Sequence, residues 1–174
     1  MIELILVVLI LGILFSLSAV TVSALAPVYR LRSASRNLGA LIEEIRAIAI
    51  NRGRPMGIRY TMGLGEDPSF YRLIPPAPDD YPDQPIEDRE PGMKHELPLG
   101  VRFRQVGFSS GRAVKAPGSV VIIFSPMGNT GSHVVTLEGT GKDGNPVLLS
   151  VKFNAVTGLI DFQEGEAEFQ HHEG

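Results

Sequence analysis

The first 27 residues of this 174-residue chain form an almost unbroken apolar run, in which Glu3 is the only charged residue. A run of about 20 apolar residues is the length that a helix needs to cross the hydrocarbon core of a bilayer. A buried helix of a small soluble domain would instead show a polar face. A signal peptide has a shorter apolar region after a basic segment, although the small residues at 23–26 leave cleavage open. The run therefore predicts a membrane-spanning helix over residues 1–27.

Glu3 is the unusual residue of this run, because a charged side chain at the centre of a bilayer costs about 2.5–3.5 kcal/mol on insertion scales. At the end of the helix it can reach the interface, where the positive end of the helix dipole favours a carboxylate. Two interpretations remain open at this point. Glu3 is either a carboxylate at a helix end or one that pairs with a charge on another subunit, such as an N-terminal ammonium.

After Pro27 the pattern changes from wholly apolar to amphipathic. The following residues recur at three- and four-residue spacing, as on one face of a helix: Leu31, Ala34, Leu38, Leu41, Ile42, Ile45 and Ile48. Residues 1–52 together predict a helix of about 75 Å at 1.5 Å per residue, kinked at Pro27. Gly53 and Pro55 are expected to end it. The amphipathic half, 28–52, needs a sheet to cover its apolar stripe.

The remainder of the chain, residues 53–174, predicts a β-rich head. Short apolar or alternating runs predict seven strands, at residues 56–61, 70–74, 101–106, 120–124, 134–138, 147–153 and 159–162. The run 120–124 is wholly apolar, which indicates a strand buried on both faces. Asp143-Gly144 is typical of a hairpin turn between two of the strands. One long helix followed by strands predicts an α+β fold, with the helix packed on an antiparallel sheet.

The segment from Ile2 to Leu14 closely resembles the N-terminus of type IV pilins and type II secretion pseudopilins. Glu3 stands where the family has its glutamate, and Gly12 matches the glycine of the Gly-Ile-Leu sequence that follows it. In that family a basic leader is removed by prepilin peptidase, and the mature chain begins with an N-methylated Phe. This sequence begins inside that pattern, so leader processing and methylation are implied by the resemblance.

The resemblance also implies roles for residues of this segment. Ile2, Leu4, Gly12 and Pro27 would belong to a helix that forms the core of a filament. Glu3 would set the axial register by pairing with the terminal amine of a neighbouring subunit.

Three stretches of the head, 47–55, 123–131 and 151–158, resemble the H-type minor pseudopilins and the related FimT-type minor pilins. This resemblance implies a pilin fold and a minor structural subunit of a type II secretion pseudopilus or a type IV pilus. Such a subunit is assembled from the bacterial inner membrane and supports protein export. The implied partners are other pilin or pseudopilin subunits, membrane lipid, the assembly platform and prepilin peptidase.

The arginines after the apolar run and the family topology predict opposite orientations of the chain in the membrane. Arg30, Arg32 and Arg36 come directly after the apolar run, and the positive-inside rule alone would place them in the cytoplasm. The family has the reverse topology, with the head on the periplasmic side, and a basic leader would restore the balance. We follow the family topology.

DNA uptake is the alternative function, because some FimT-type minor pilins are DNA receptors. The net charge of −3 provides no electrostatic footprint for nucleic acid. The segment 161–169 is acidic, and Leu159 stands where an arginine would help. Arg102, Arg104, Arg112 and Lys115 form the one basic cluster that the sequence indicates, and a solvated strand face explains it better. We therefore do not expect nucleic acid as a partner.

Residues 75–98 form an insertion rich in proline and acidic residues. Its carboxylates offer oxygens of the kind that Ca²⁺ prefers, at Asp79, Asp80, Asp83, Glu87 and Asp88. They lack the alternation of an EF-hand loop, so we favour a solvated loop that contacts a neighbouring subunit and is stiffened by its prolines.

No credible active site emerges from the sequence. Zinc ligation by His171, His172 and Glu173 is conceivable, but a flexible acidic tail is the better interpretation. His133 borders a strand and is expected at the surface. The chain has no cysteine, and no serine lies in a nucleophile motif. The stretch 128–132 lacks the lysine of a phosphate loop. We expect neither an enzyme, nor a metal site, nor a cofactor.

Overall fold

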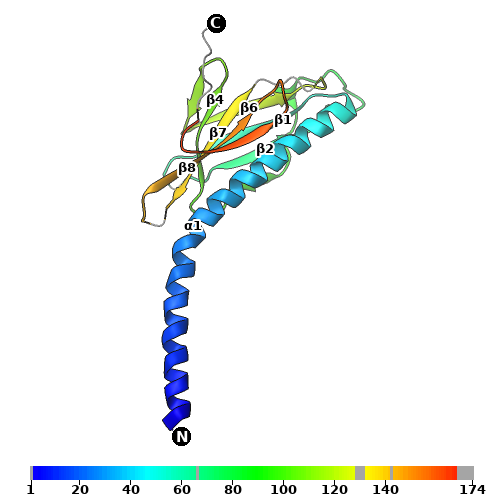
Figure 1. The fold of residues 1–174 in the computed structure, drawn as a ribbon. Coiled ribbons are helices and arrows are strands. Elements are labelled where there is room, and N and C mark those ends of the chain that lie inside the picture. Colours follow the sequence, from blue (N-terminus) through cyan, green and yellow to red (C-terminus); the bar gives the residue numbers. More distant parts are fainter. Residues whose placement is uncertain (1, 66, 128–131, 142, 168–174) are drawn as a thin grey trace.

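The computed structural model describes residues 2–65, 67–127, 132–141 and 143–167, and for residues 14–25 it describes the backbone alone. In this part of the chain the protein is α+β. A single helix, α1 (Ile2–Arg52), is followed by nine strands and a short 3₁₀ helix, η1 (Ile86–Asp88). The first half of α1 projects away from the head, and the second half lies along the sheets (Figure 1).

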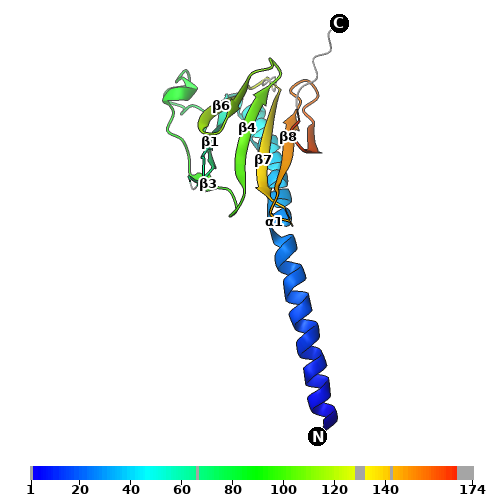
Figure 2. The same ribbon diagram turned by 90° about the vertical axis from the view of Figure 1, so that its left-hand side faces the viewer.

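The strands form two antiparallel sheets. The four-stranded sheet has the order β3-β2-β1-β6, with bounds β3 (Lys94–Glu96), β2 (Phe70–Ile74), β1 (Met56–Met62) and β6 (Gly118–Phe124). The five-stranded sheet has the order β5-β4-β7-β8-β9, with bounds β5 (Ala113–Lys115), β4 (Arg102–Phe108), β7 (His133–Thr140), β8 (Pro146–Phe153) and β9 (Ile160–Glu164). The two sheets meet where β1 lies beside β4 and β5 beside β6 (Figure 2).

The core lies between the second half of α1 and the two sheets. Five members of the predicted stripe are almost fully buried, namely Leu31, Ala34, Leu38, Ile42 and Ile45. The other two, Leu41 and Ile48, are half-buried against the same core. Full burial of each Leu or Ile side chain contributes about 1.5–3 kcal/mol relative to exposure. The sheets face this stripe with large aromatic residues. Tyr60 of β1 meets Phe103 of β4 edge to face at 5.3 Å between ring centroids.

Pro27 lies inside α1, at the base of the projecting half. Proline has no amide hydrogen to donate to the carbonyl of residue 23, and its ring crowds that carbonyl. The helix changes direction where it reaches the head, as Figure 1 shows. The predicted kink therefore separates a half that packs on the head from a half that does not.

Two sequence predictions about the head are wrong. The apolar run 120–124 is not buried on both faces, because β6 is the edge strand of its sheet and Ile123 is 42% exposed. His133 is not a surface residue, because its side chain is fully buried. The rings of Phe124 and Phe153 lie 6.2 Å and 5.6 Å from it and cover a position that looks peripheral in sequence.

The insertion 75–98 is more ordered than a solvated loop. It contains η1 and β3, and β3 pairs with β2. Its side chains Ala77, Ile86 and Arg89 are buried, so the insertion packs on the head. The strands β3 and β5 were both missed, since each has three residues and too little pattern to predict.

Candidate assembly interface

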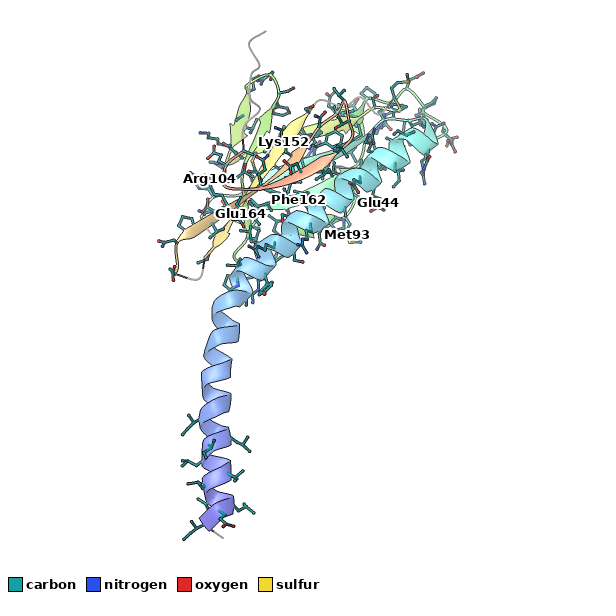
Figure 3. All side chains as sticks on the ribbon, in the orientation of Figure 1. Glu44, Met93, Arg104, Lys152, Phe162 and Glu164 are labelled. Atoms are coloured by element: carbon teal, nitrogen blue, oxygen red, sulfur yellow. The ribbon has the colours of Figure 1, made fainter. Side chains whose placement is uncertain are left out.

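Residues 2–13, in the projecting half of α1, carry an exposed apolar surface. Among residues 2–13, each large hydrophobic side chain is exposed, from 47% at Ile10 to 83% at Ile2. Figure 3 shows these side chains around the helix, away from the head. A monomeric soluble protein rarely exposes a contiguous apolar patch of more than a few hundred Å². This surface therefore requires an apolar environment, which lipid or other apolar helices would provide.

The structure places Ile2, Glu3, Leu4 and Gly12 together on this projecting segment. Glu3 lies in the first turn of α1, where backbone amides have no intrahelical partner and favour a carboxylate. A Cβ added at Gly12 would meet nothing within 4 Å. Packing inside the subunit therefore does not require glycine there, whereas close approach of a second helix would benefit from it.

The predicted membrane span over residues 1–27 extends beyond the described side chains, since those of residues 14–25 are not described. Among the described residues, no helix has a stretch both long and apolar enough to cross a membrane.

Comparisons with known proteins do not place the chain in a family. Scans against protein-family models, curated proteins and solved structures found no match.

The predicted basic cluster on the five-stranded sheet is partly neutralised. Arg102 donates a hydrogen bond to Glu138, and Arg104 lies 3.4 Å from the other carboxylate oxygen of the same residue. Arg112 and Lys115 are exposed. Glu138 therefore balances one of the four positive charges of this cluster.

A different group of cations, Arg59, Arg72 and Lys94, lies on the four-stranded sheet. This group was not predicted, because β3, which carries Lys94, was not predicted. The strands β1 and β2 were predicted, but only their register places Arg59 opposite Arg72 on the same face.

The insertion is held to the head by Arg89, whose side chain is 6% exposed. Its guanidinium donates to the carbonyl oxygens of Gln84, Pro55 and Pro75. Burial lowers the pKa of this group from its ordinary value. The carbonyl groups replace the water that the guanidinium loses, so Arg89 fixes the insertion against the start of β1.

The acidic residues of the insertion do not form a calcium site in the described structure. Asp79 is bound to Arg54, with 2.6 Å between carboxylate oxygen and guanidinium nitrogen. Among the described residues, no three His, Cys, Asp or Glu side chains come close enough to hold a metal ion. The candidate zinc ligands His171, His172 and Glu173 lie outside the described residues, as do residues 128–131.

Proposed function

We propose that this chain is a pilin-like structural subunit, a minor pseudopilin or minor pilin of a type II secretion pseudopilus or a type IV pilus. The observation that carries the proposal is the division of one continuous helix into two unlike halves. The half after Pro27 buries a single stripe against the sheets, whereas in the half before it the large apolar side chains of residues 2–13 are all exposed. A helix built in this way suits assembly into a bundle of equivalent helices.

The proposed cycle involves no catalysis. The projecting helix anchors the subunit in the bacterial inner membrane, with the head in the periplasm. Assembly then moves the helix from lipid into a filament core made of the same helices from other subunits. Both environments are apolar, so the exposed side chains of residues 2–13 remain away from water throughout.

In this proposal Glu3 sets the axial register between the helices of neighbouring subunits. Transfer into the filament core takes its carboxylate away from the membrane interface, and breaking a buried ion pair typically costs about 3–5 kcal/mol. A terminal ammonium of the neighbouring subunit would satisfy the carboxylate at one axial position only. The contact therefore selects the axial offset between helices, whereas apolar packing alone tolerates sliding.

The test is replacement of Glu3 in the full chain, expressed in cells that assemble such filaments. Glu3→Ala and Glu3→Leu are expected to reach the membrane at normal levels but to be depleted at least tenfold from sheared filaments, because a tenfold change corresponds to only about 1.4 kcal/mol. Immunoblots of membrane and filament fractions measure both quantities. Glu43→Ala is the matched control, because Glu43 is an exposed carboxylate on the packed half of the helix. Normal incorporation of both Glu3 variants would refute the register role.

A further inference from the structure

A row of three cations crosses the outer face of the four-stranded sheet. In the antiparallel register Arg59 lies directly opposite Arg72, and Arg72 lies directly opposite Lys94. Directly opposite residues share one face, and neighbouring strands are about 4.8 Å apart, so the row spans roughly 10 Å. Like charges in this position destabilise a sheet. The row therefore lowers the stability of the sheet, and folding of the head does not require these three charges.

The described part of the subunit neutralises only one of these charges. Lys94 lies 2.7 Å from a carboxylate oxygen of Glu96. Arg59 and Arg72 make no ion pair with a described carboxylate, and the Nε of Arg72 is buried without a hydrogen-bond partner there. The ring of Phe70 lies 5.6 Å from the Arg72 guanidinium carbon and 4.4 Å from Lys94 Nζ. Cation–π contact steadies these groups but leaves two positive charges unneutralised.

The same chain carries a rigid acidic turn. Two backbone hydrogen bonds, from Tyr81 to Pro78 and from Gln84 to Tyr81, define the turn. The Arg89 guanidinium fixes it by binding the carbonyl of Gln84. Asp80 and Asp83 are exposed, and Tyr81 between them is 71% exposed. In the described part of the subunit, no ion pair joins Asp80 or Asp83 to the cation row.

We propose that the row Arg59–Arg72–Lys94 receives the acidic turn, residues 79–83, of a second copy of this chain. Asp80 and Asp83 complement the two uncompensated charges, and Tyr81 offers an aromatic surface to the exposed side of the row. The turn is already ordered, so little conformational entropy is lost on docking.

The inference rests on the proposed function, since a filament brings the heads of successive subunits together. A contact between two different patches of identical subunits is heterologous, and repeated heterologous contacts build helical filaments. The head contact would then act beside the helix bundle, and its charges would select which head neighbours which.

The test uses the absence of cysteine from the sequence. Two differently tagged full-length copies are co-expressed, one with Val121→Cys beside the row and one with Pro82→Cys in the turn. A bismaleimide is expected to link the two copies in membranes.

The charges of the row are tested by substitution. Arg72→Glu in the first copy should lower the yield of cross-linked dimer at least fivefold, and Asp83→Lys in the second copy should restore it. High salt should weaken the linkage, because the pairs are near the surface. Arg112→Glu is the control with the same charge change and should have no effect.

Three results would overturn the head contact. These are no cross-link, a yield that Arg72→Glu leaves unchanged, or a loss that Asp83→Lys does not restore. Binding of duplex DNA to the full chain in detergent that falls with Arg72→Glu, in place of the charge-swap rescue, would assign the row to nucleic acid instead.

The readouts separate this contact from the role of Glu3. The same cross-link, measured on concentrated full-length protein in detergent, does not need filament assembly. Charge-dependent linkage together with normal incorporation of Glu3→Ala would remove the register role and leave the head contact. A cross-link yield that does not depend on these charges, together with blocked incorporation of Glu3→Ala, would remove the head contact and leave the register role.

Discussion

At the scale of single residues, Tyr60 shows how a polar group can be retained at a cost. Its side chain is completely buried, and its hydroxyl has no hydrogen-bond partner among the described residues. Burial, followed by the nearby Tyr71, raises the pKa of Tyr60 far above its ordinary value. The phenolate is therefore strongly disfavoured in the folded head. An unsatisfied buried hydroxyl typically costs about 1–3 kcal/mol, while the ring fills the space beside Phe103.

Tyr60→Phe is accordingly expected to raise the free energy of unfolding at neutral pH by about 1 kcal/mol. In the wild type, the unfolded chain ionises Tyr60 near pH 10 and the folded chain does not, so stability falls as pH rises past that value. The variant should lose stability less steeply there. Urea titrations of the detergent-solubilised chain at pH 7 and above pH 10 measure both effects. Tyr81→Phe, at an exposed position, should change neither, and a clear destabilisation by Tyr60→Phe would reveal a missing hydrogen-bond partner.

At the scale of elements, α1 joins two environments through Pro27. The packed half is held by its buried stripe and by contacts from the edge strand β9. Arg32 Nη2 lies 3.2 Å from Glu164 Oε1. A Cβ added at Gly39 would lie 2.7 Å from the Phe162 ring. Figure 3 shows Phe162 and Glu164 beside this half of the helix. The large apolar side chains of residues 2–13 are exposed, so we expect Pro27 to set the direction in which the projecting half leaves the head.

Pro27→Ala should straighten the helix by restoring the amide that bonds to the carbonyl of residue 23. Spin labels at Leu9→Cys and Met93→Cys, both exposed positions, report the angle between the projecting half and the head. The distance distribution is expected to shift and to narrow. Tyr29→Ala is the control, because Tyr29 is 65% exposed two residues further along. An unchanged distribution in Pro27→Ala would show that packing at the base of the head sets the bend.

At the scale of the whole molecule, the apolar helix and the folded core occupy separate parts of the chain. The buried hydrophobic residues of the described structure run from Leu31 to Ala167, and none lies before Leu31. The described side chains of residues 2–13 therefore contribute exposed apolar surface but no buried core residue. Removing it should change solubility without changing the stability of the head.

A chain lacking residues 1–26 is expected to remain in solution without detergent, whereas the full chain requires it. Its free energy of unfolding should match that of the full chain in detergent to within about 1 kcal/mol, the scale of a single mutational effect. Sedimentation and urea titration measure the two properties. Unfolding or aggregation of the truncated chain would show that the projecting half supports the head.

Local pattern was sufficient for much of this structure. The three- and four-residue spacing after Pro27 predicted most of the buried side chains of α1, and short apolar or alternating runs predicted the strands β1 and β2. These features depend on neighbours within a few positions along the chain, because the helix and strand periods appear directly as the spacing of apolar residues. The same is true of the Asp143-Gly144 turn between β7 and β8.

Other features depended on residues far apart in sequence. β3 is a strand because β2 offers it a partner, and His133 is buried because Phe124 and Phe153 come from two other strands to cover it. The cation row exists only through the register that aligns Arg59, Arg72 and Lys94. The sequence by itself determined the helix, its two halves and the α+β class, since these follow from local periodicity. Only the tertiary structure decided which polar side chains are buried or aligned, because strand pairing brings distant residues together and local pattern does not record it.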